Sequence, residues 1–192
     1  MNIKTVVDGM YGENSYIVFD EKGNCALIDP AAADVIRTVS DAGLRPVCIL
    51  LTHGHFDHIS EVDACAKSFD VPVYIHGDDA ELLRDAFKNA SAPLLGDYTL
   101  VSTTPCSVFD GAKITVGDLV FDVLHTPGHT QGCVCYFCEN AVFTGDTLFA
   151  NGYGRTDLYG GDYGKLVDSI HSLLPRLSGK TIYPGHGVSR KF

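Results

Sequence analysis

The first half of the chain alternates short apolar runs with turn residues, and three further segments have helical spacing. Apolar runs bounded by Gly, Pro, Asn or Asp predict strands. The predicted strands of this half are Asn2–Val7, Ser15–Asp20, Cys25–Asp29, Pro46–Leu51 and Pro72–Ile75. Apolar residues three and four positions apart predict helices over Ala31–Ala42, Ser60–Ser68 and Asp78–Lys88. Asn89–Leu100 carries neither pattern and predicts an irregular loop.

The second half repeats this organisation with more hairpins. The predicted strands are Lys113–Val116, Leu119–Leu124, Cys133–Phe137, Ala141–Phe143 and Thr181–Tyr183, and Asp162–Leu174 is a predicted helix. In both halves the strands come first and the helices follow. This order favours an α/β fold in which two sheets pack together and helices cover their outer faces.

Composition narrows the class of protein. The chain has 192 residues, of which 45% are hydrophobic and 20% charged, which excludes a disordered chain and fits a single domain over residues 1–192. A net charge of −10 argues against a nucleic-acid partner. No apolar run approaches the roughly 20 residues of a membrane span, and the first ten residues lack the features of a signal peptide. We therefore expect no membrane contact and a cytoplasmic location.

The seven cysteines lie mostly in apolar runs. In a reducing compartment such residues are expected to be small buried hydrophobes. Cys133, Cys135 and Cys138 are close enough to suggest a metal site, but zinc sites more often use Cys-x₂-Cys pairs. We expect these three side chains to pack in the core.

The densest chemical feature is Thr52-His53-Gly54-His55-Phe56-Asp57-His58, which has three His and one Asp within six positions. It follows an apolar strand and precedes a predicted helix. His53 and His55 alternate, so an extended backbone directs both side chains to one side. Imidazole and carboxylate groups suit zinc, iron or manganese. The segment therefore predicts a metal site.

The same arrangement recurs three times later in the chain. An apolar strand leads each time through a glycine-containing turn to a residue type that binds metals, namely His129, Asp146 and His186. Glycine allows the sharp turn and a close approach of the backbone. Four strand ends that point the same way would bring these groups together at one edge of the sandwich.

These residues resemble the ligand pattern of the metallo-β-lactamase superfamily, and the resemblance extends over essentially the whole chain. The matching positions are His53, His55, Asp57, His58, His129, Asp146 and His186. The stretches Phe143–Phe149 and Gly154–Asp157 resemble the glyoxalase II-like branch, the hydroxyacylglutathione hydrolases. The resemblance implies a four-layer αββα sandwich with a site for two divalent metal ions.

Carried over residue by residue, the resemblance assigns the ligands to two ions. The first would be held by His53, His55 and His129, the second by Asp57, His58 and His186, and Asp146 would bridge both. Zinc is the expected metal, with iron and manganese as alternatives.

The resemblance also implies a metal-dependent hydrolase of thioesters, such as S-acylglutathione-type substrates, that acts through a metal-bridging hydroxide. Two neighbouring divalent ions generate hydroxide near neutral pH and stabilise the oxyanion formed by its attack on a carbonyl. A thiolate leaving group needs little protonation, because the pKa of a thiol is about 8.5. We expect Asp57 to orient the hydroxide or to carry its proton. The partner is then a small-molecule substrate.

Three residues outside the ligand set are further candidates. Asp29 follows a predicted strand, and in similar proteins this Asp orients a ligand His through its second ring nitrogen. Arg155 is expected to join Asp157 in tying loops together rather than to touch substrate. Tyr153 either lines the pocket or packs against the protein.

Other activities in the superfamily use related ligand sets. A persulfide dioxygenase has a nearly identical set but a single iron, and Gly128–Val134 resembles that branch too. A lactonase has the same ligands. Class B β-lactamases lack the bridging Asp, so Asp146 argues against them. The sequence leaves the oligomeric state open.

Few residues follow the last expected ligand. Long glyoxalase II enzymes carry a C-terminal helical domain with basic residues for glutathione, whereas only Val188–Phe192 follow Gly187 here. We therefore expect that domain to be missing. Arg190 and Lys191 are the nearest basic side chains for an anionic substrate, although a frayed terminus is the expected state.

Overall fold

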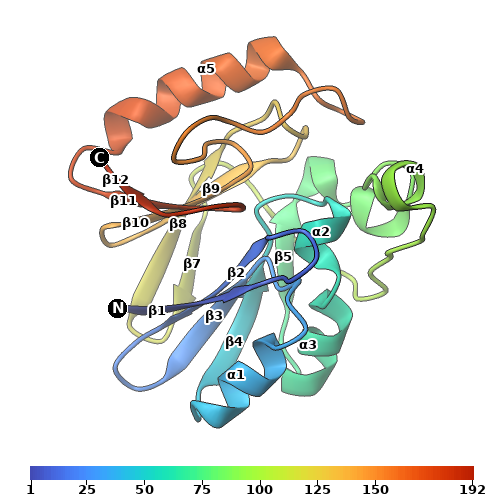
Figure 1. Ribbon diagram of the computed structural model, residues 1–192. Coiled ribbons are helices and arrows are strands. Elements are labelled where there is room, and N and C mark those ends of the chain that lie inside the picture. Colours follow the sequence, from blue (N-terminus) through green and yellow to red (C-terminus); the bar gives the residue numbers. More distant parts are fainter.

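Two six-stranded sheets pack face to face in the computed structural model, which describes residues 1–192 (Figure 1). Their strand orders are β1-β2-β3-β4-β5-β6 and β12-β11-β10-β9-β8-β7. The strands are β1 (Asn2–Val7), β2 (Asn14–Phe19), β3 (Asn24–Ile28), β4 (Arg45–Leu50), β5 (Val73–His76), β6 (Cys106–Val108), β7 (Lys113–Val116), β8 (Leu119–His125), β9 (Val134–Cys138), β10 (Ala141–Gly145), β11 (Thr181–Pro184) and β12 (Arg190–Lys191). Both sheets mix parallel and antiparallel pairs.

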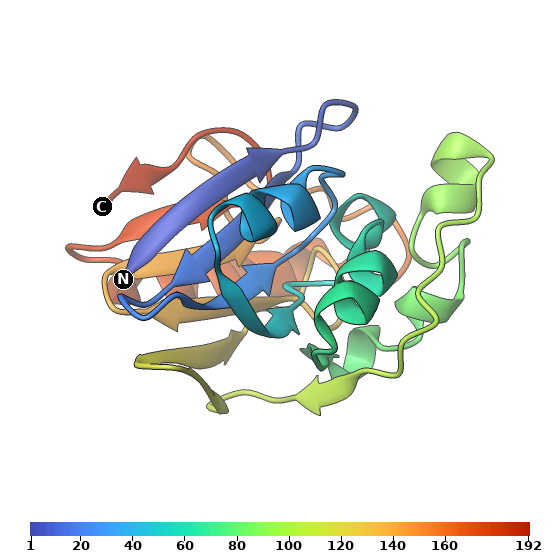
Figure 2. The same cartoon turned by 90° about the horizontal axis from the view of Figure 1, so that it is seen from below.

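Helices cover the outer faces of the sheets and complete four layers. The α-helices are α1 (Val35–Asp41), α2 (Phe56–Ile59), α3 (Val62–Phe69), α4 (Ser91–Leu95) and α5 (Tyr163–Leu173). Figure 2 shows α1 in blue and α3 in green over the first sheet, while α5 lies over the second sheet in Figure 1. The expected four-layer αββα sandwich is therefore confirmed. No helix combines the length and apolar character needed to span a membrane.

The core consists of one apolar layer between the sheets and one under each helical layer. Phe121, Tyr136 and Phe143 are fully buried between the sheets. The hydroxyl of Tyr136 donates a hydrogen bond to the carbonyl of Leu51 at 3.0 Å, which joins the two sheets. Cys133, Cys135 and Cys138 are buried as expected, and Cys106 is the exposed cysteine.

Strand direction brings the ends of four strands to one edge of the sandwich. β10 runs parallel to β11, and β8 has the same direction because β9 is antiparallel to both β8 and β10. In the first sheet β4 runs parallel to β3 and β5. The segments that leave the carboxyl ends of β4, β8, β10 and β11 carry the expected metal ligands.

Two predicted helices begin later than expected because long-range hydrogen bonds engage their first residues. Ser15 Oγ accepts hydrogen bonds from the backbone N–H groups of Ala31 and Ala32, and α1 begins only at Val35. The predicted helix at Ser60 is in fact preceded by the short helix α2. Ser60 Oγ donates to the carbonyl of Ala31 and the backbone N–H of Glu61 donates to the carbonyl of Pro30, and α3 then begins at Val62.

The predicted helix Asp78–Lys88 is wrong. This segment forms two 3-10 turns, Gly77–Asp79 and Leu82–Arg84. Asp85 Oδ1 accepts from the backbone N–H groups of Phe87 and Lys88, which offers these groups a local alternative to a helix.

Three other elements differ from the sequence prediction. The loop predicted over Asn89–Leu100 contains α4, and the short strand β6 has no counterpart among the predicted strands. The expectation of a frayed terminus is also wrong, because β12 pairs with β11, with Arg190 opposite Ile182 and Lys191 opposite Thr181.

Replacing Asp63 by Ala is expected to lower the free energy of unfolding at neutral pH. Asp63, in the first turn of α3, accepts four hydrogen bonds of 2.7–2.9 Å from the backbone N–H groups and hydroxyls of Ser102 and Thr103. Burial raises the pKa of Asp63, but these bonds outweigh it and lower the pKa from 3.8 to about 2. Allowing for solvent screening, we expect a loss of about 1–2 kcal/mol.

The stabilisation by Asp63 is pH dependent, because the folded protein binds its proton less tightly than the unfolded chain. It is complete above pH 3.8 and is lost as the pH falls toward about 2. Urea unfolding of wild type and Asp63→Ala across this range measures the difference. A gap that stays constant down to the lowest pH would contradict this role of the ionised carboxylate.

Candidate metal centre

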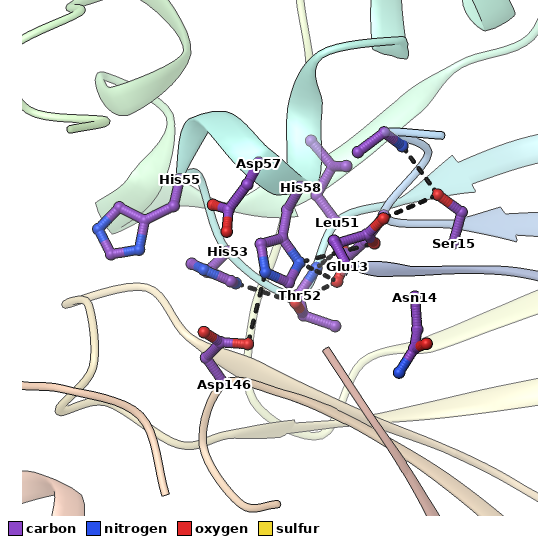
Figure 3. A network of polar contacts seen from close by, with 12 residues as sticks. Glu13, Asn14, Ser15, Leu51, Thr52, His53, His55, Asp57, His58 and Asp146 are labelled. Atoms are coloured by element: carbon purple, nitrogen blue, oxygen red, sulfur yellow. Dashed lines mark hydrogen bonds and ion pairs between the residues drawn. The ribbon is translucent and has the colours of Figure 1, made fainter. Parts of the chain in front are cut away.

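All seven expected ligands lie together at the strand-end edge of the sandwich. His53 and His55 follow β4, Asp57 and His58 lie on α2, and three single residues follow β8, β10 and β11. Those three are His129, Asp146 and His186. Figure 3 shows His58 and Asp146 side by side, with His53 and Asp57 next to them. The site thus combines residues from both sheets.

The ligand set divides into two groups of three residues. In each group the candidate ligand atoms lie within 4.8 Å of one another; the groups are His53, His55 and His129, and Asp57, His58 and His186. Asp146 lies between them. Its Oδ1 is 3.4 Å from His58 Nε2, and its Oδ2 is 3.6 Å from His129 Nε2 and 3.7 Å from His186 Nε2.

Several buried polar atoms in this group have no hydrogen-bond partner. They are the Nε2 atoms of His53, His55 and His58, and Oδ1 of Asp146. A buried polar atom without a partner is destabilising, so such atoms are rare in folded proteins. Neutral imidazole nitrogens and carboxylate oxygens with free lone pairs are the donors that divalent transition metals prefer. The residues present therefore fit metal ions.

The protonation states agree with metal binding. Burial and the neighbouring imidazole rings lower the pKa of His53 well below its ordinary value, and burial and His129 lower that of His55 to about 3. Burial raises the pKa of Asp146, but His58, His129 and His186 outweigh it and hold this carboxyl ionised. Neutral imidazoles, as at His53 and His55, and an ionised carboxylate, as at Asp146, are the ligand states that a metal requires.

The surroundings of the His58 ring favour a positive charge on it. Burial lowers its pKa, but Asp146 and Asp57 outweigh burial and, with a hydrogen bond to Asp29, raise the pKa well above its ordinary value. A cation at His58 Nε2 would supply this charge while Nδ1–H donates to Asp29 at 3.0 Å.

Asp29 fixes the position of two expected ligands. Its carboxylate accepts hydrogen bonds from the backbone N–H of Thr52 at 2.7 Å and from the Thr52 hydroxyl at 2.6 Å. The same hydroxyl lies 3.1 Å from His53 Nδ1. Asp29 also has a positive φ of 47°, a strained conformation for a residue with a Cβ. The sequence prediction linked Asp29 to one ligand His, and the structure places it beside His58 and indirectly beside His53.

A buried carboxyl that the sequence analysis missed lies behind His58. Glu13 is fully buried, its Oε1 has no partner, and it is 4.0 Å from His58 Nδ1. Burial raises the pKa of Glu13 well above its ordinary value. Next to it, Asn14 Nδ2 donates to the carbonyls of Pro184 and Gly187. The polar run Glu13-Asn14-Ser15 before an apolar strand was the available sequence signal.

Asp79 was also missed, although it joins the two loops that carry ligands. This fully buried carboxylate accepts from the backbone N–H of Gly54 at 3.0 Å, from the Thr130 hydroxyl at 2.7 Å and from the backbone N–H of Gly132 at 2.7 Å. Gly54 lies between His53 and His55, and Thr130 follows His129. Asp79 therefore sets the spacing of the first ligand group.

Arg155 and Tyr153 occupy different places around the centre. The carbonyl of Arg155 accepts from His129 Nδ1 at 2.7 Å, while its guanidinium makes two bonds of 2.7 and 2.8 Å to Asp157. This ion pair lies within one loop. Tyr153 is half exposed and lines a neighbouring cavity instead of the metal cleft.

The metal cleft is an open depression of about 290 Å³. Five expected ligands line it, and apolar side chains form much of its wall; the ligands are His55, Asp57, His129, Asp146 and His186. The apolar wall residues are Phe56, Ala90, Leu94, Phe149 and Leu158. A small substrate in this cleft would reach the ligand groups while contacting mainly apolar surface.

The chain matches a family model described as the metallo-beta-lactamase superfamily over residues 8–186. It is 36% identical over 179 residues to "Probable metallo-hydrolase YqgX" of Bacillus subtilis, covering 91% of this chain and 84% of the relative. It is 31% identical over 194 residues to "Hydroxyacylglutathione hydrolase GloC" of Haemophilus influenzae, covering 97% and 91%.

Solved structures with the same fold include several that resemble the chain along nearly its whole length. One is BLEG-1, described as a B3 metallo-beta-lactamase (TM-score 0.94, 35% identity, 98% of this chain and 93% of that chain). Another is TTHA1623 in a di-iron-bound form (0.84, 34%, 98% and 94%). A third is ETHE1 from Myxococcus xanthus (0.80, 30%, 98% and 76%).

Replacing Asp79 by Asn is expected to destabilise the protein and weaken metal binding. The amide would direct an N–H₂ group at a backbone N–H or at the Thr130 hydroxyl, so at least one buried hydrogen bond is lost. We expect a loss of about 1–3 kcal/mol in unfolding free energy. We also expect about a tenfold or greater loss of metal affinity, the usual effect of removing a residue that orients ligands.

Metal retention against a competing chelator and thermal unfolding measure these two effects. Asp78→Asn is the matched control, because the neighbouring Asp78 side chain is 59% exposed. Equal metal retention in Asp79→Asn, Asp78→Asn and wild type would show that Asp79 does not set the ligand spacing.

Proposed function

The chain belongs to the metallo-beta-lactamase superfamily, and we propose that it hydrolyses thioesters at a pair of divalent metal ions. The observation that carries this proposal is the arrangement of two three-residue groups on either side of Asp146, with unpaired buried nitrogen and oxygen atoms. Membership makes a metal-dependent hydrolase the starting point, and the relative named hydroxyacylglutathione hydrolase supports the thioester as substrate.

In this proposal each group binds one ion. His53, His55 and His129 would hold the first, Asp57, His58 and His186 would hold the second, and Asp146 would contribute to both. The nitrogen-rich donor set suits zinc, and the di-iron-bound relative supports iron as an alternative. Manganese fits the same donors.

The chain's own residues orient and protect the reacting groups. When bound, two divalent ions activate water near neutral pH and stabilise negative charge on a carbonyl oxygen. The cleft walls of Phe56, Phe149 and Leu158 limit the access of bulk water to the acyl group. Asp29 and Asp79 hold the ligand side chains in register, so they do not rearrange during the reaction.

Asp57 is the ionised carboxylate that we assign to the attacking water molecule. Burial raises its pKa, but His58 and a hydrogen bond from His186 outweigh it and keep the pKa below its ordinary value. Its Oδ2 lies 3.3 Å from His186 Nε2. An ionised carboxylate at this point can orient a water molecule and accept its proton. The departing thiolate needs little protonation, so the reaction does not depend on a strong acid.

A persulfide dioxygenase is the second candidate function, and the ETHE1 relative favours it. That reaction uses a single iron, for which one of the two groups is sufficient. The presence of a second complete group, Asp57, His58 and His186, favours the hydrolase. A lactonase would use the same centre. Because one relative is described as a B3 metallo-beta-lactamase, a β-lactam must also be tested as a substrate.

Purified protein is expected to contain two metal ions per chain and to release thiol from S-lactoylglutathione. Elemental analysis, thiol release and oxygen uptake on the same preparation separate the candidates. Chelation should abolish hydrolysis, and restoring the metal should recover it. One iron per chain with oxygen consumption on glutathione persulfide would replace the hydrolase by a dioxygenase, and turnover of only a lactone or a β-lactam would remove the thioester.

Replacing Asp57 by Asn is expected to lower kcat by about 10²- to 10⁴-fold, because the amide cannot accept the proton. The amide oxygen can still bind a metal, so elemental analysis should find metal retained at the second group. Asp118→Asn is the control, since Asp118 forms a solvent-exposed ion pair with Lys22. Full turnover by a fully loaded Asp57→Asn protein would exclude this role.

A further inference from the structure

A second cavity of about 370 Å³ adjoins the metal cleft. Phe149 lines both spaces, and its ring packs edge-on against the ring of His186 at 6.1 Å. The segment from Phe149 to Arg155 forms the boundary between them, with Tyr153 facing the second cavity and Arg155 the metal cleft. We call this space the side cavity. Phe149 is the lining residue that it shares with the metal cleft.

The wall of the side cavity is mainly apolar and comes from three elements. Val167, Ile170 and Leu174 extend from α5 and its C-terminal turn, and Leu148 and Phe149 come from the loop after β10. His171 on α5 and Arg190 on β12 also line it, and the Arg190 guanidinium already donates to the carbonyl of Ala150 at 2.7 Å and lies over the ring of Phe192 at 5.0 Å. The cavity is thus suited to an uncharged ligand.

The metal cleft also lacks a free cation among its lining residues. Arg155 is the one residue among the lysines and arginines that lines the cleft. Its guanidinium is held by two hydrogen bonds to Asp157. The net charge of −10 adds a repulsive field for anions. Apart from the proposed metal ions, an anionic thiol such as glutathione therefore finds little charge complementarity here, whereas apolar groups find surface in both spaces.

We propose that the side cavity binds the apolar acyl chain of the substrate, so that this enzyme selects thioesters by acyl chain rather than by thiol. The inference rests on the proposed thioester hydrolysis and names the substrate class of that site. A carbonyl over the ligand groups would direct its chain past Phe149 into the side cavity. A volume of about 370 Å³ falls in the range of small-molecule sites.

The proposal predicts that kcat/KM rises with acyl length on a constant, uncharged thiol. Each methylene that leaves water for an apolar wall should increase kcat/KM about three- to fourfold until the cavity is full. The series runs from acetyl to octanoyl thioesters of N-acetylcysteamine. A second series keeps the acetyl group and lengthens an alkyl thiol, and here kcat/KM should change little.

A matched pair of variants tests where the chain binds. Val167→Trp fills the side cavity, while Asp168→Trp places the same side chain on the exposed face of α5 one residue later. Val167→Trp should abolish the dependence of kcat/KM on acyl length. Asp168→Trp should behave as wild type. The chain contains no other Trp, so a blue-shifted fluorescence from Val167→Trp relative to Asp168→Trp checks that the cavity is occupied.

Direct binding separates this inference from the proposed function. Calorimetry of octanoate against butyrate on metal-loaded wild type and Val167→Trp requires no hydrolysis. Tighter binding of octanoate, lost in Val167→Trp, supports the side cavity even if no thioester is turned over, in which case only the proposed function fails. Equal binding of the two acids, a rate that follows thiol length, or identical behaviour of the two Trp variants would overturn the inference.

Discussion

The approach of Asp146 to imidazoles from three different strand ends is the constraint that the rest of the site depends on. Its carboxylate oxygens lie 3.4–3.7 Å from the Nε2 atoms of His58, His129 and His186. This close packing leaves no room for a Cβ on two neighbouring backbone positions. A Cβ on Gly185 would lie 2.2 Å from Asp146 Oδ1, and a Cβ on Gly145 would lie 2.3 Å from the Thr52 hydroxyl. Glycine is therefore required on both strand ends.

Buried carboxyls outside the ligand set hold this arrangement in place. Asp29 orders the β4 end through Thr52, and Asp79 joins that end to the loop after β8. Glu13 and Asn14 fix the start of β2 against His58 and the turn after β11. The ligand side chains are thus positioned by hydrogen bonds that exist without a metal, which reduces the reorganisation needed when one binds.

The sequence was sufficient for the fold class and for finding the ligand candidates, because each of these residues follows an apolar strand through a local pattern. Asp79 could not be found this way, since its partners Gly54, Thr130 and Gly132 are 25 to 53 positions away. The same residue lies in a segment whose apolar spacing predicted a helix, where side-chain hydrogen bonds at Asp85 compete with helical ones. Asp29 was identified only through the family resemblance. The resemblance indicated that it contacts a ligand His far along the chain, which local spacing does not reveal.

The division of the ligand set between the sheets has a consequence for the stability of the whole fold. His53, His55, Asp57 and His58 follow a strand of the first sheet, and His129, Asp146 and His186 follow strands of the second. Ions bound by both sets would act as cross-links between chain segments more than seventy positions apart. His55 and His129 are one such pair, with ring nitrogens 2.9 Å apart. Like a disulfide, such a link would remove entropy from the unfolded chain. Metal binding would therefore raise the free energy of unfolding of the whole domain.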